Sequence, residues 1–177
     1  MPNKATIARA KQEKREGKSA STQAGEFIKE TMDDIRSGRI GARSTKQAIA
    51  IGLSKARRAG VDLPPPTKGK TSETTRRNAK RAYEVGQTEP NRPVNPKRSK
   101  ATTKALRREG TEAASHEAIS KQVSQQAKKR TPAQRSASAR KGAQTRMAHQ
   151  TAAERSAIGR KTGKTRRTNA KASTRAS

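Results

Sequence analysis

The large aliphatic and aromatic side chains of this chain are few and unevenly placed, which limits where a core can form. Leu, Ile, Val and Phe number only 16 of 177 residues, and ten of these precede Pro64. Much of the remaining hydrophobic fraction is Ala, which buries little area per residue. Such a composition is typical of disordered chains. We therefore predict a mostly α fold with extensive disorder, in which an N-terminal helical hairpin is followed by a basic tail with short marginal helices.

The clearest helix signal lies between Ala42 and Gly60, in ARSTKQAIAIGLSKARRAG. Ser44 is placed to act as N-cap, and Gln47 follows three residues later, as in a capping box. Apolar residues then recur at helical spacing. Cations fill the last turns, where they meet the negative end of the helix dipole, and Gly60 supplies a left-handed stop.

A second amphipathic helix is predicted over residues 23–37, with Thr22 as its N-cap. We expect the two helices to form an antiparallel hairpin over 22–63, with their apolar stripes facing each other. A hairpin of this size is near the lower limit of independent stability. It would be completed by homodimerisation, by a charged helix over 4–16 that packs through Ile7, or by a bound partner. The facing stripes are Phe27, Ile28, Met32 and Ile35 on one helix and Ile49, Leu53 and Ala56 on the other.

The opposite face of the first hairpin helix is acidic, and it has two interpretations. Glu26, Glu30, Asp33 and Asp34 gather there. They form either the solvated side of an amphipathic helix or an internal counter-ion patch that holds the basic tail when nucleic acid is absent.

Proline and glycine divide the rest of the chain. Leu63–Pro66 (LPPP) ends the hairpin, because proline cannot continue a helix. Helical pieces are predicted over 72–85 and 99–129, with Gly86 and Gly110 as stops, and the three prolines of EPNRPVNPKRSK between them predict an extended linker. The predicted segments are a charged N-terminal helix or arm (1–21), the helical hairpin (22–63), a Pro-containing basic linker with one short helix (64–98), a basic helical segment (99–130) and a basic repeat tail (131–177).

The last segment contains a repeat with an offset of 20 residues. TPAQRSASARKGAQTR from Thr131 aligns with TAAERSAIGRKTGKTR from Thr151, and nine of the sixteen positions are identical. Each copy begins with a capping box, formed by Thr131 with Gln134 and by Thr151 with Glu154. Neither copy has an apolar stripe, so we expect marginal helices that form when phosphate neutralises them.

Positive charge predicts the class of partner. The chain has 43 Lys and Arg against 14 Asp and Glu, a formal charge of +29. Residues 1–64 contribute 14 cations and 7 acids, and the rest contributes 29 and 7. Nucleic acid, and DNA in particular, is the expected partner, with RNA as the alternative. The predicted nucleic-acid-binding residues are Arg76, Arg77, Lys80, Arg81, Lys97, Arg98, Lys100, Lys104, Arg107, Arg108, Lys128, Lys129, Arg130, Arg135, Arg140, Lys141, Arg146, Arg155, Arg160, Lys161, Lys164, Arg166 and Arg167.

Enzymatic chemistry is not indicated. The triplets Gly69-Lys70-Thr71 and Gly163-Lys164-Thr165 lack the upstream glycine of a phosphate-binding loop. Both His residues are isolated and Cys is absent, so no metal site is predicted. We expect no catalytic residues, no cofactor, no small-molecule substrate and no membrane association. The expected location is the cytoplasm, at the nucleoid.

Parts of the sequence resemble known protein families or motifs in three ways. Ser21–Glu30 (STQAGEFIKE), Ala42–Gly60 and Leu63–Pro66 resemble a family of short, basic bacterial proteins of unknown function, which are often labelled DNA-binding or histone-like. Glu154–Thr165 (ERSAIGRKTGKT) is similar to the glycine-and-lysine repeats of bacterial stress-induced proteins, although Thr162 replaces a glycine. Asn95-Pro96-Lys97-Arg98 is similar to the minor-groove motifs of linker-histone tails.

Charge and resemblance together predict a nucleoid-associated, linker-histone-like protein. It would bind DNA without sequence preference, by neutralising phosphates with a disordered basic tail. One alternative is an RNA- or ribosome-associated basic protein. Another is a disordered stress protectant or protein-interaction module.

Overall fold

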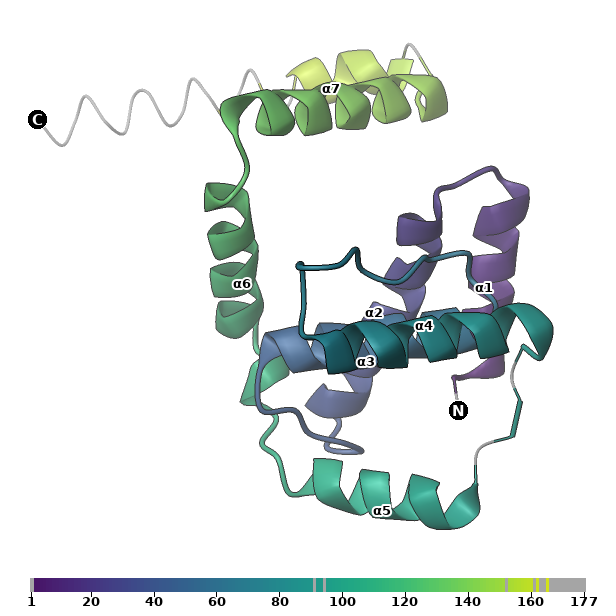
Figure 1. Ribbon diagram of the computed structural model, residues 1–177. Helices are drawn as coiled ribbons and strands as arrows, with labels where there is room; N and C mark the ends of the chain where they lie inside the picture. The colour runs from purple at the N-terminus through teal and green to yellow at the C-terminus, as the bar shows by residue number, and fades with distance from the viewer. Residues whose placement is uncertain are drawn as a thin grey trace, which may run out of the picture. The chain divides into compact units, whose positions relative to one another are not determined.

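The part of the chain that the structure describes is helical. The computed structural model describes residues 2–90, 92–93, 95–151, 153–160, 162 and 165. Its contacts divide the chain into two compact units, Met1–Ser124 and Gln125–Ser177. The elements (Figure 1) are α1 (Lys4–Arg15), α2 (Ala20–Arg36), α3 (Thr45–Arg58), α4 (Glu73–Thr88), α5 (Pro96–Arg107), the 3-10 helix η1 (Glu112–Ala114), α6 (His116–Lys128) and α7 (Pro132–His149).

The prediction of extensive disorder with a hairpin is wrong, and the composition of the core explains the error. Of the thirteen buried hydrophobic residues among those described, nine are Ala. Small side chains let helix backbones approach closely, so contact between helices here does not need many large side chains. Counting only Leu, Ile, Val and Phe therefore underestimated how much of the chain can pack.

The core of the first unit is built on α2. One cluster joins Phe27 to residues of α1 and α3 and to Val61, and the other joins Met32 and Ile35 to Ala48 of α3 and to η1. Ile7 of α1 packs against the first cluster, which is one of the three completions expected from the sequence. α2 begins at Ala20 after Ser19, so Thr22 lies inside the helix and is not its N-cap.

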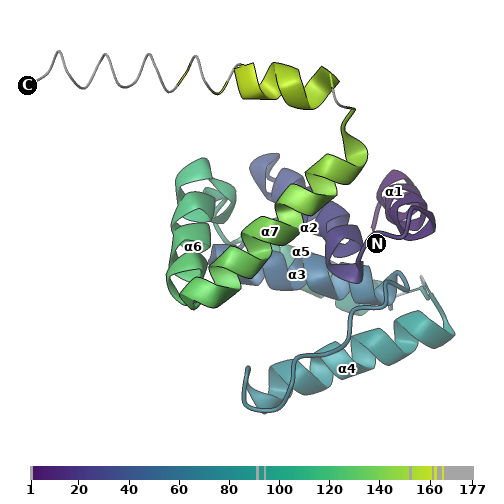
Figure 2. The same cartoon turned by 90° about the horizontal axis from the view of Figure 1, so that it is seen from above.

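α2 and α3 pack on each other, but they do not form the predicted antiparallel hairpin. Figures 1 and 2 show α2 crossing α3 obliquely. The crossing depends on Gly52, because a Cβ there would lie 2.7 Å from the Ile28 Cα. Ser44 caps α3 as predicted, by accepting from the Gln47 backbone N–H at 3.2 Å, whereas the Gln47 side chain accepts from Arg43 N at 3.0 Å. Gly60 ends the helix region with φ +85°.

α4 packs on α3 through a second close backbone contact. Gly86 was predicted to end this helix, but it lies inside α4. Its role there is packing, because a Cβ at this position would collide with the Arg57 carbonyl oxygen of α3. The Arg57 side chain donates to Leu63 O at 3.0 Å and to Pro64 O at 3.3 Å, which fixes the proline segment against the end of α3. Burial of Arg57 lowers the pKa of its guanidinium.

α5, η1 and α6 return to the N-terminal core. Thr45 Oγ1 donates to Ala113 O at 2.8 Å, and Arg36 Nε donates to Ala114 O at 3.0 Å. Ile119 of α6 packs against the same cluster. These contacts span more than sixty positions in sequence, so no local pattern indicated them.

The second unit begins inside α6 and contains α7 and a further helical stretch over residues 153–160. Both predicted capping boxes are confirmed. Gln134 N donates to Thr131 Oγ1 at 3.2 Å while Thr131 N donates to Gln134 Oε1 at 3.1 Å, and Thr151 and Glu154 make the corresponding pair of bonds. Pro132 stands in the first turn, as predicted.

Candidate nucleic-acid interface

The predicted cations on α4 differ in how they are paired. Arg76 forms two hydrogen bonds with the Glu73 carboxylate, at 2.6 and 2.9 Å, and this bonding lowers the pKa of Glu73. Lys80 Nζ lies 3.7 Å from Glu84 Oε1. Arg77 and Arg81, one helical turn apart, are exposed and form no ion pair within the described residues, although the charge of Arg77 also helps to lower the pKa of Glu73. Two of the four cations are therefore free to meet an external anion.

α5 begins where the linker was predicted to remain extended. Asn95 is its N-cap, and the Asn95 side chain accepts from Lys97 N at 3.0 Å and from Arg98 N at 3.3 Å. Pro96 occupies the first turn, where its missing N–H leaves no helical bond unmade. The stretch that was compared with minor-groove motifs is thus a helix start, and its two cations belong to the first turn of α5.

Most cations of α5 gather on one side of the helix. With 3.6 residues per turn, Lys97, Lys100, Lys104, Arg107 and the C-cap Arg108 fall within an arc of about 100°, and Arg98 lies about 80° beyond one edge of that arc. All five are exposed. Like charges one turn apart destabilise an isolated helix by a few tenths of a kcal/mol per pair, roughly, so this arrangement is costly unless an anion is present.

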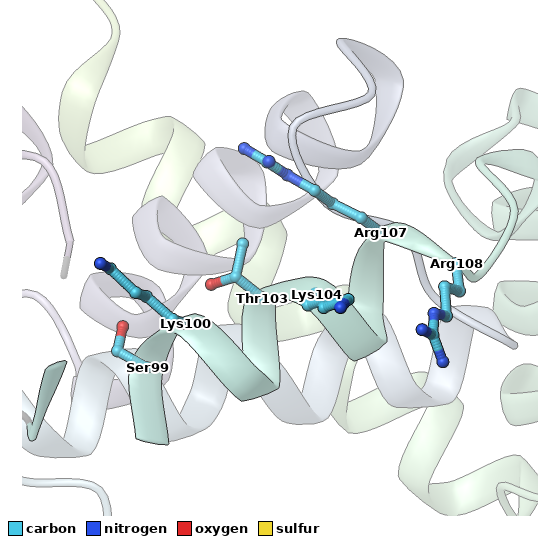
Figure 3. A pocket seen from close by; sticks show the side chains of 6 residues that line it. All are labelled: Ser99, Lys100, Thr103, Lys104, Arg107 and Arg108. Carbon is cyan, nitrogen blue, oxygen red and sulfur yellow. The ribbon is translucent and has the colours of Figure 1, made fainter. Parts of the chain in front are cut away.

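An open hollow of about 640 Å³ lies along this side of α5 (Figure 3). Thr103 stands between Lys100 and Arg107 in that view, and Arg108 extends from the C-terminal end of the helix. No acidic residue lines the hollow, and the hydroxyls of Ser99 and Thr103 have no hydrogen-bond partner in the part of the chain that is described. Proteins usually contact phosphate oxygens with Lys, Arg and hydroxyl side chains. The hollow presents four such cations and two such hydroxyls. The residues that line it are Ser99, Lys100, Thr103, Lys104, Arg107 and Arg108.

The acidic face of α2 is occupied by partners within the first unit. Glu26 pairs with Arg9 of α1 at 2.6 Å, and Lys55 of α3 lies 3.1 Å from Glu30 and 2.9 Å from Asp34. The side chains of Glu30 and Asp34 are only 12% and 18% exposed. These three carboxylates join α2 to α1 and α3, so neither interpretation describes them. Asp33, the fourth residue of the face, is 50% exposed and within the described residues pairs only with Arg36 of the same helix, as the solvated-side interpretation expects.

Two cations that the sequence argument left out lie beside α5. Arg39 and Arg43 belong to the loop between α2 and α3, and Arg107 of α5 donates from Nε to Arg39 O at 3.2 Å. All of the predicted binding residues follow Pro64, because most of the positive charge lies in that part of the sequence. The only available signal was the pair of glycines, Gly38 and Gly41, that mark this segment as an exposed loop.

The predicted cations of the second unit are spread around its helices. Arg135, Arg140, Lys141 and Arg146 are exposed on α7, where Arg135 and Arg146 share one side while Arg140 and Lys141 lie on other sides of the helix. Arg155 instead has a structural role, because it donates to Met147 O at 3.0 Å and to Gln150 O at 2.8 Å at the end of α7. Arg160 donates to Ser156 Oγ at 2.8 Å, and Lys128, Lys129 and Arg130 lie at and just after the end of α6. The remaining predicted residues, Lys161, Lys164, Arg166 and Arg167, lie outside the described residues.

The described ranges hold no group of three or more His, Cys, Asp or Glu that is placed to bind a metal ion. None of the helices described is both long enough and apolar enough to cross a membrane.

Comparison with known proteins adds a family match and no activity. Residues 11–68 match the model of a family of unknown function, DUF6496. No curated protein and no solved structure matches the chain. The matched block contains α2, α3 and the proline segment, and it ends before α4. The basic side of α5 therefore lies outside it, and DNA binding remains a prediction.

Proposed function

We propose that this protein binds duplex DNA without sequence preference, as a nucleoid-associated protein, by neutralising backbone phosphates with cations on helices. The observation that carries the proposal is the basic side of α5. Four cations and two unpaired hydroxyls line one open hollow there, with no acidic side chain among them. The mechanism differs from the one expected from the sequence, since the contacting side chains lie on folded helices and not on a disordered tail.

The neighbouring helices support a role for the charge of α5 in binding. In the N-terminal helices, carboxylates of α2 neutralise Arg9, Lys55 and Arg39. Cations on α5, by contrast, are left to repel one another. A phosphate backbone would remove that repulsion and release counter-ions, so binding should weaken steeply as salt rises.

The residue types favour duplex backbone over single strands. Single-stranded nucleic acid is usually held by aromatic side chains on which bases stack. The chain has one Phe, one Tyr and no Trp. Phe27 is fully buried, and the Tyr83 hydroxyl donates to Asp62 at 2.7 Å. Contacts to phosphates supply affinity and carry no sequence information, which agrees with binding that lacks sequence preference.

The test uses the full-length chain, because cutting at Pro64 would remove η1 and Ile119 from the N-terminal core. Affinity is measured on two unrelated duplexes over a salt series. The triple variant Lys97→Gln/Lys100→Gln/Lys104→Gln should bind about ten- to a hundredfold more weakly at low salt. Its plot of log K against log salt should be shallower by about 2.7, which is 0.9 for each of three lost contacts.

A matched control removes the same charge from α1. Lys4→Gln/Lys11→Gln/Lys14→Gln changes three exposed lysines that have no acidic partner among the described residues. Equal losses for the two triple variants would show that only net charge matters and would contradict a binding role for α5. A strong preference for one duplex would contradict binding without sequence preference.

A cellular experiment separates DNA from the alternative partner. Crosslinking in living cells, followed by recovery of the protein, should yield chromosomal DNA as the main nucleic acid. Recovery of mostly ribosomal RNA would replace the proposal with the ribosome-associated alternative.

A further inference from the structure

The loop between α2 and α3 is joined to the end of α5 by backbone hydrogen bonds. Gly41 N donates to Leu106 O at 2.9 Å, and Ala42 N donates to Gly110 O at 3.0 Å. A Cβ at Gly41 would collide with the Glu109 carbonyl oxygen, so only glycine permits this approach. The junction therefore fixes the loop cations beside the basic side of α5.

Both loop cations are exposed, and each has a carboxylate partner. The side chains of Arg39 and Arg43 are 64% and 78% exposed. Arg39 Nη2 lies 2.7 Å from Asp34 Oδ1, and Asp34 is also bound to Lys55. Arg43 Nη2 lies 3.2 Å from Glu109 Oε1. Arg43 is the only cation among the described residues that pairs with Glu109.

The two ion pairs differ in how easily they can be opened. Asp34 joins α2 to α3 through Lys55, so its displacement would disturb the helix packing. Glu109, whose side chain is 27% exposed, forms an ion pair with Arg43 alone among the described residues, and that arginine is 78% exposed, so water screens this pair more than it screens the Asp34 pair. A backbone phosphate can bind an Arg guanidinium through two parallel hydrogen bonds. Phosphate can thus replace Glu109 at Arg43 at little cost to the fold.

We propose that Arg39 and Arg43 extend the DNA-binding surface of α5 across this junction, and that Glu109 is an internal counter-ion which a DNA phosphate displaces from Arg43. This inference rests on the proposed function. It assigns two binding residues that the sequence pattern did not indicate, and it gives Glu109 the role of limiting affinity in the free protein.

The experiment is a double-mutant cycle on the full-length chain, measured as affinity for one duplex over a salt series. Glu109→Gln should tighten binding about two- to fivefold, as expected when an exposed arginine is released from its one carboxylate partner. In an Arg43→Gln background the same substitution should have a much smaller effect, since no cation is left to release. Arg39→Gln and Arg43→Gln should each weaken binding more than Lys11→Gln, which removes an exposed cation from α1.

Glu117→Gln on α6 is the control for net charge, because Glu117 is exposed and has no ion-pair partner among the described residues. Equal gains from Glu109→Gln and Glu117→Gln, or a gain from Glu109→Gln that persists in full without Arg43, would overturn the inference while leaving the proposed function intact. If the unaltered protein shows no salt-dependent DNA binding, the proposed function fails and this inference fails with it. Circular dichroism and thermal melting of each variant show whether it is folded.

Discussion

Helices α2 and α7 are almost equal in length, at 17 and 18 residues, but they are stabilised in opposite ways. α2 has no side-chain hydrogen bond at its N-cap, and it buries six residues against other helices. α7 has a complete capping box, and its described side chains remain wholly or partly exposed. Local chemistry is therefore enough to mark where a helix begins, whereas tertiary packing requires an apolar stripe. α7 remains available for other contacts because nothing in its sequence commits it to a core.

The comparison predicts opposite results for the same kind of truncation. Phe27 of α2 is fully buried, and Met147 of α7 is 61% exposed. Phe27→Ala should lower the free energy of unfolding of the first unit by about 3–5 kcal/mol, because it removes a large side chain and leaves a cavity. Met147→Ala should change stability by no more than about 0.5 kcal/mol. Thermal or denaturant unfolding followed by circular dichroism measures both. A small effect of Phe27→Ala would mean that the α2 core is assigned wrongly.

Glycines inside helices give a second contrast. A Cβ at Gly52 would press on the Ile28 backbone, so Gly52→Ala should destabilise the first unit by about 1–3 kcal/mol through overpacking. Gly25 of α2 and Gly142 of α7 have no neighbouring atom within 4 Å of a Cβ. Alanine at either position should instead favour its helix by about 0.5–1 kcal/mol. Unfolding experiments on Gly52→Ala and Gly25→Ala test the crossing directly, and a stabilising Gly52→Ala would contradict it.

The sequence could predict the signals that act within a few residues. The caps at Ser44, Thr131 and Thr151, the stop at Gly60 and the buried residues of α2 all follow from local spacing. What it could not supply were contacts between residues far apart in the chain. Local spacing predicts a helix stop at Gly86, because the backbone that it packs against, at Arg57, is 29 positions earlier in the chain.

The candidate interface shows the same limit. The exposed cations of α5 were all predicted, because runs of Lys and Arg are visible in the sequence. That most of them share one side of α5 follows only once the helix is known to begin at Pro96. Arg39 and Arg43 were missed because their proximity to α5 arises from the hydrogen bond between Gly41 and Leu106, which joins a loop to the last turn of α5 across 65 positions.

Loss of a cap should affect α7 without affecting the core. Thr131→Ala removes the side chain that accepts from Gln134 N, and such changes cost about 1 kcal/mol. Because α7 buries little against a core, we expect a weaker helical signal in circular dichroism at about 222 nm. The melting temperature of the first unit should not change. Thr131→Ser, which retains the acceptor, is the matched control. A fall in the melting temperature of the first unit would show that α7 contributes to its stability.

The smallest predicted effect concerns the contact between α4 and the segment that follows α3. Tyr83 is the only tyrosine, so its ionisation can be followed by ultraviolet absorbance without interference. The hydrogen bond to Asp62, together with burial and the negative charge of Asp62, raises the pKa of Tyr83 above its ordinary value near 10. Between the ordinary and the raised value the folded state holds a proton that the unfolded state has lost. The stabilisation is therefore complete below about pH 10 and disappears as pH rises through the folded-state pKa.

Asp62→Ala should return the tyrosine titration toward its ordinary position, whereas Glu84→Ala, on the same helix as Tyr83, should leave it in place. An unshifted titration in the unaltered protein would show that α4 is not held to this segment through Tyr83.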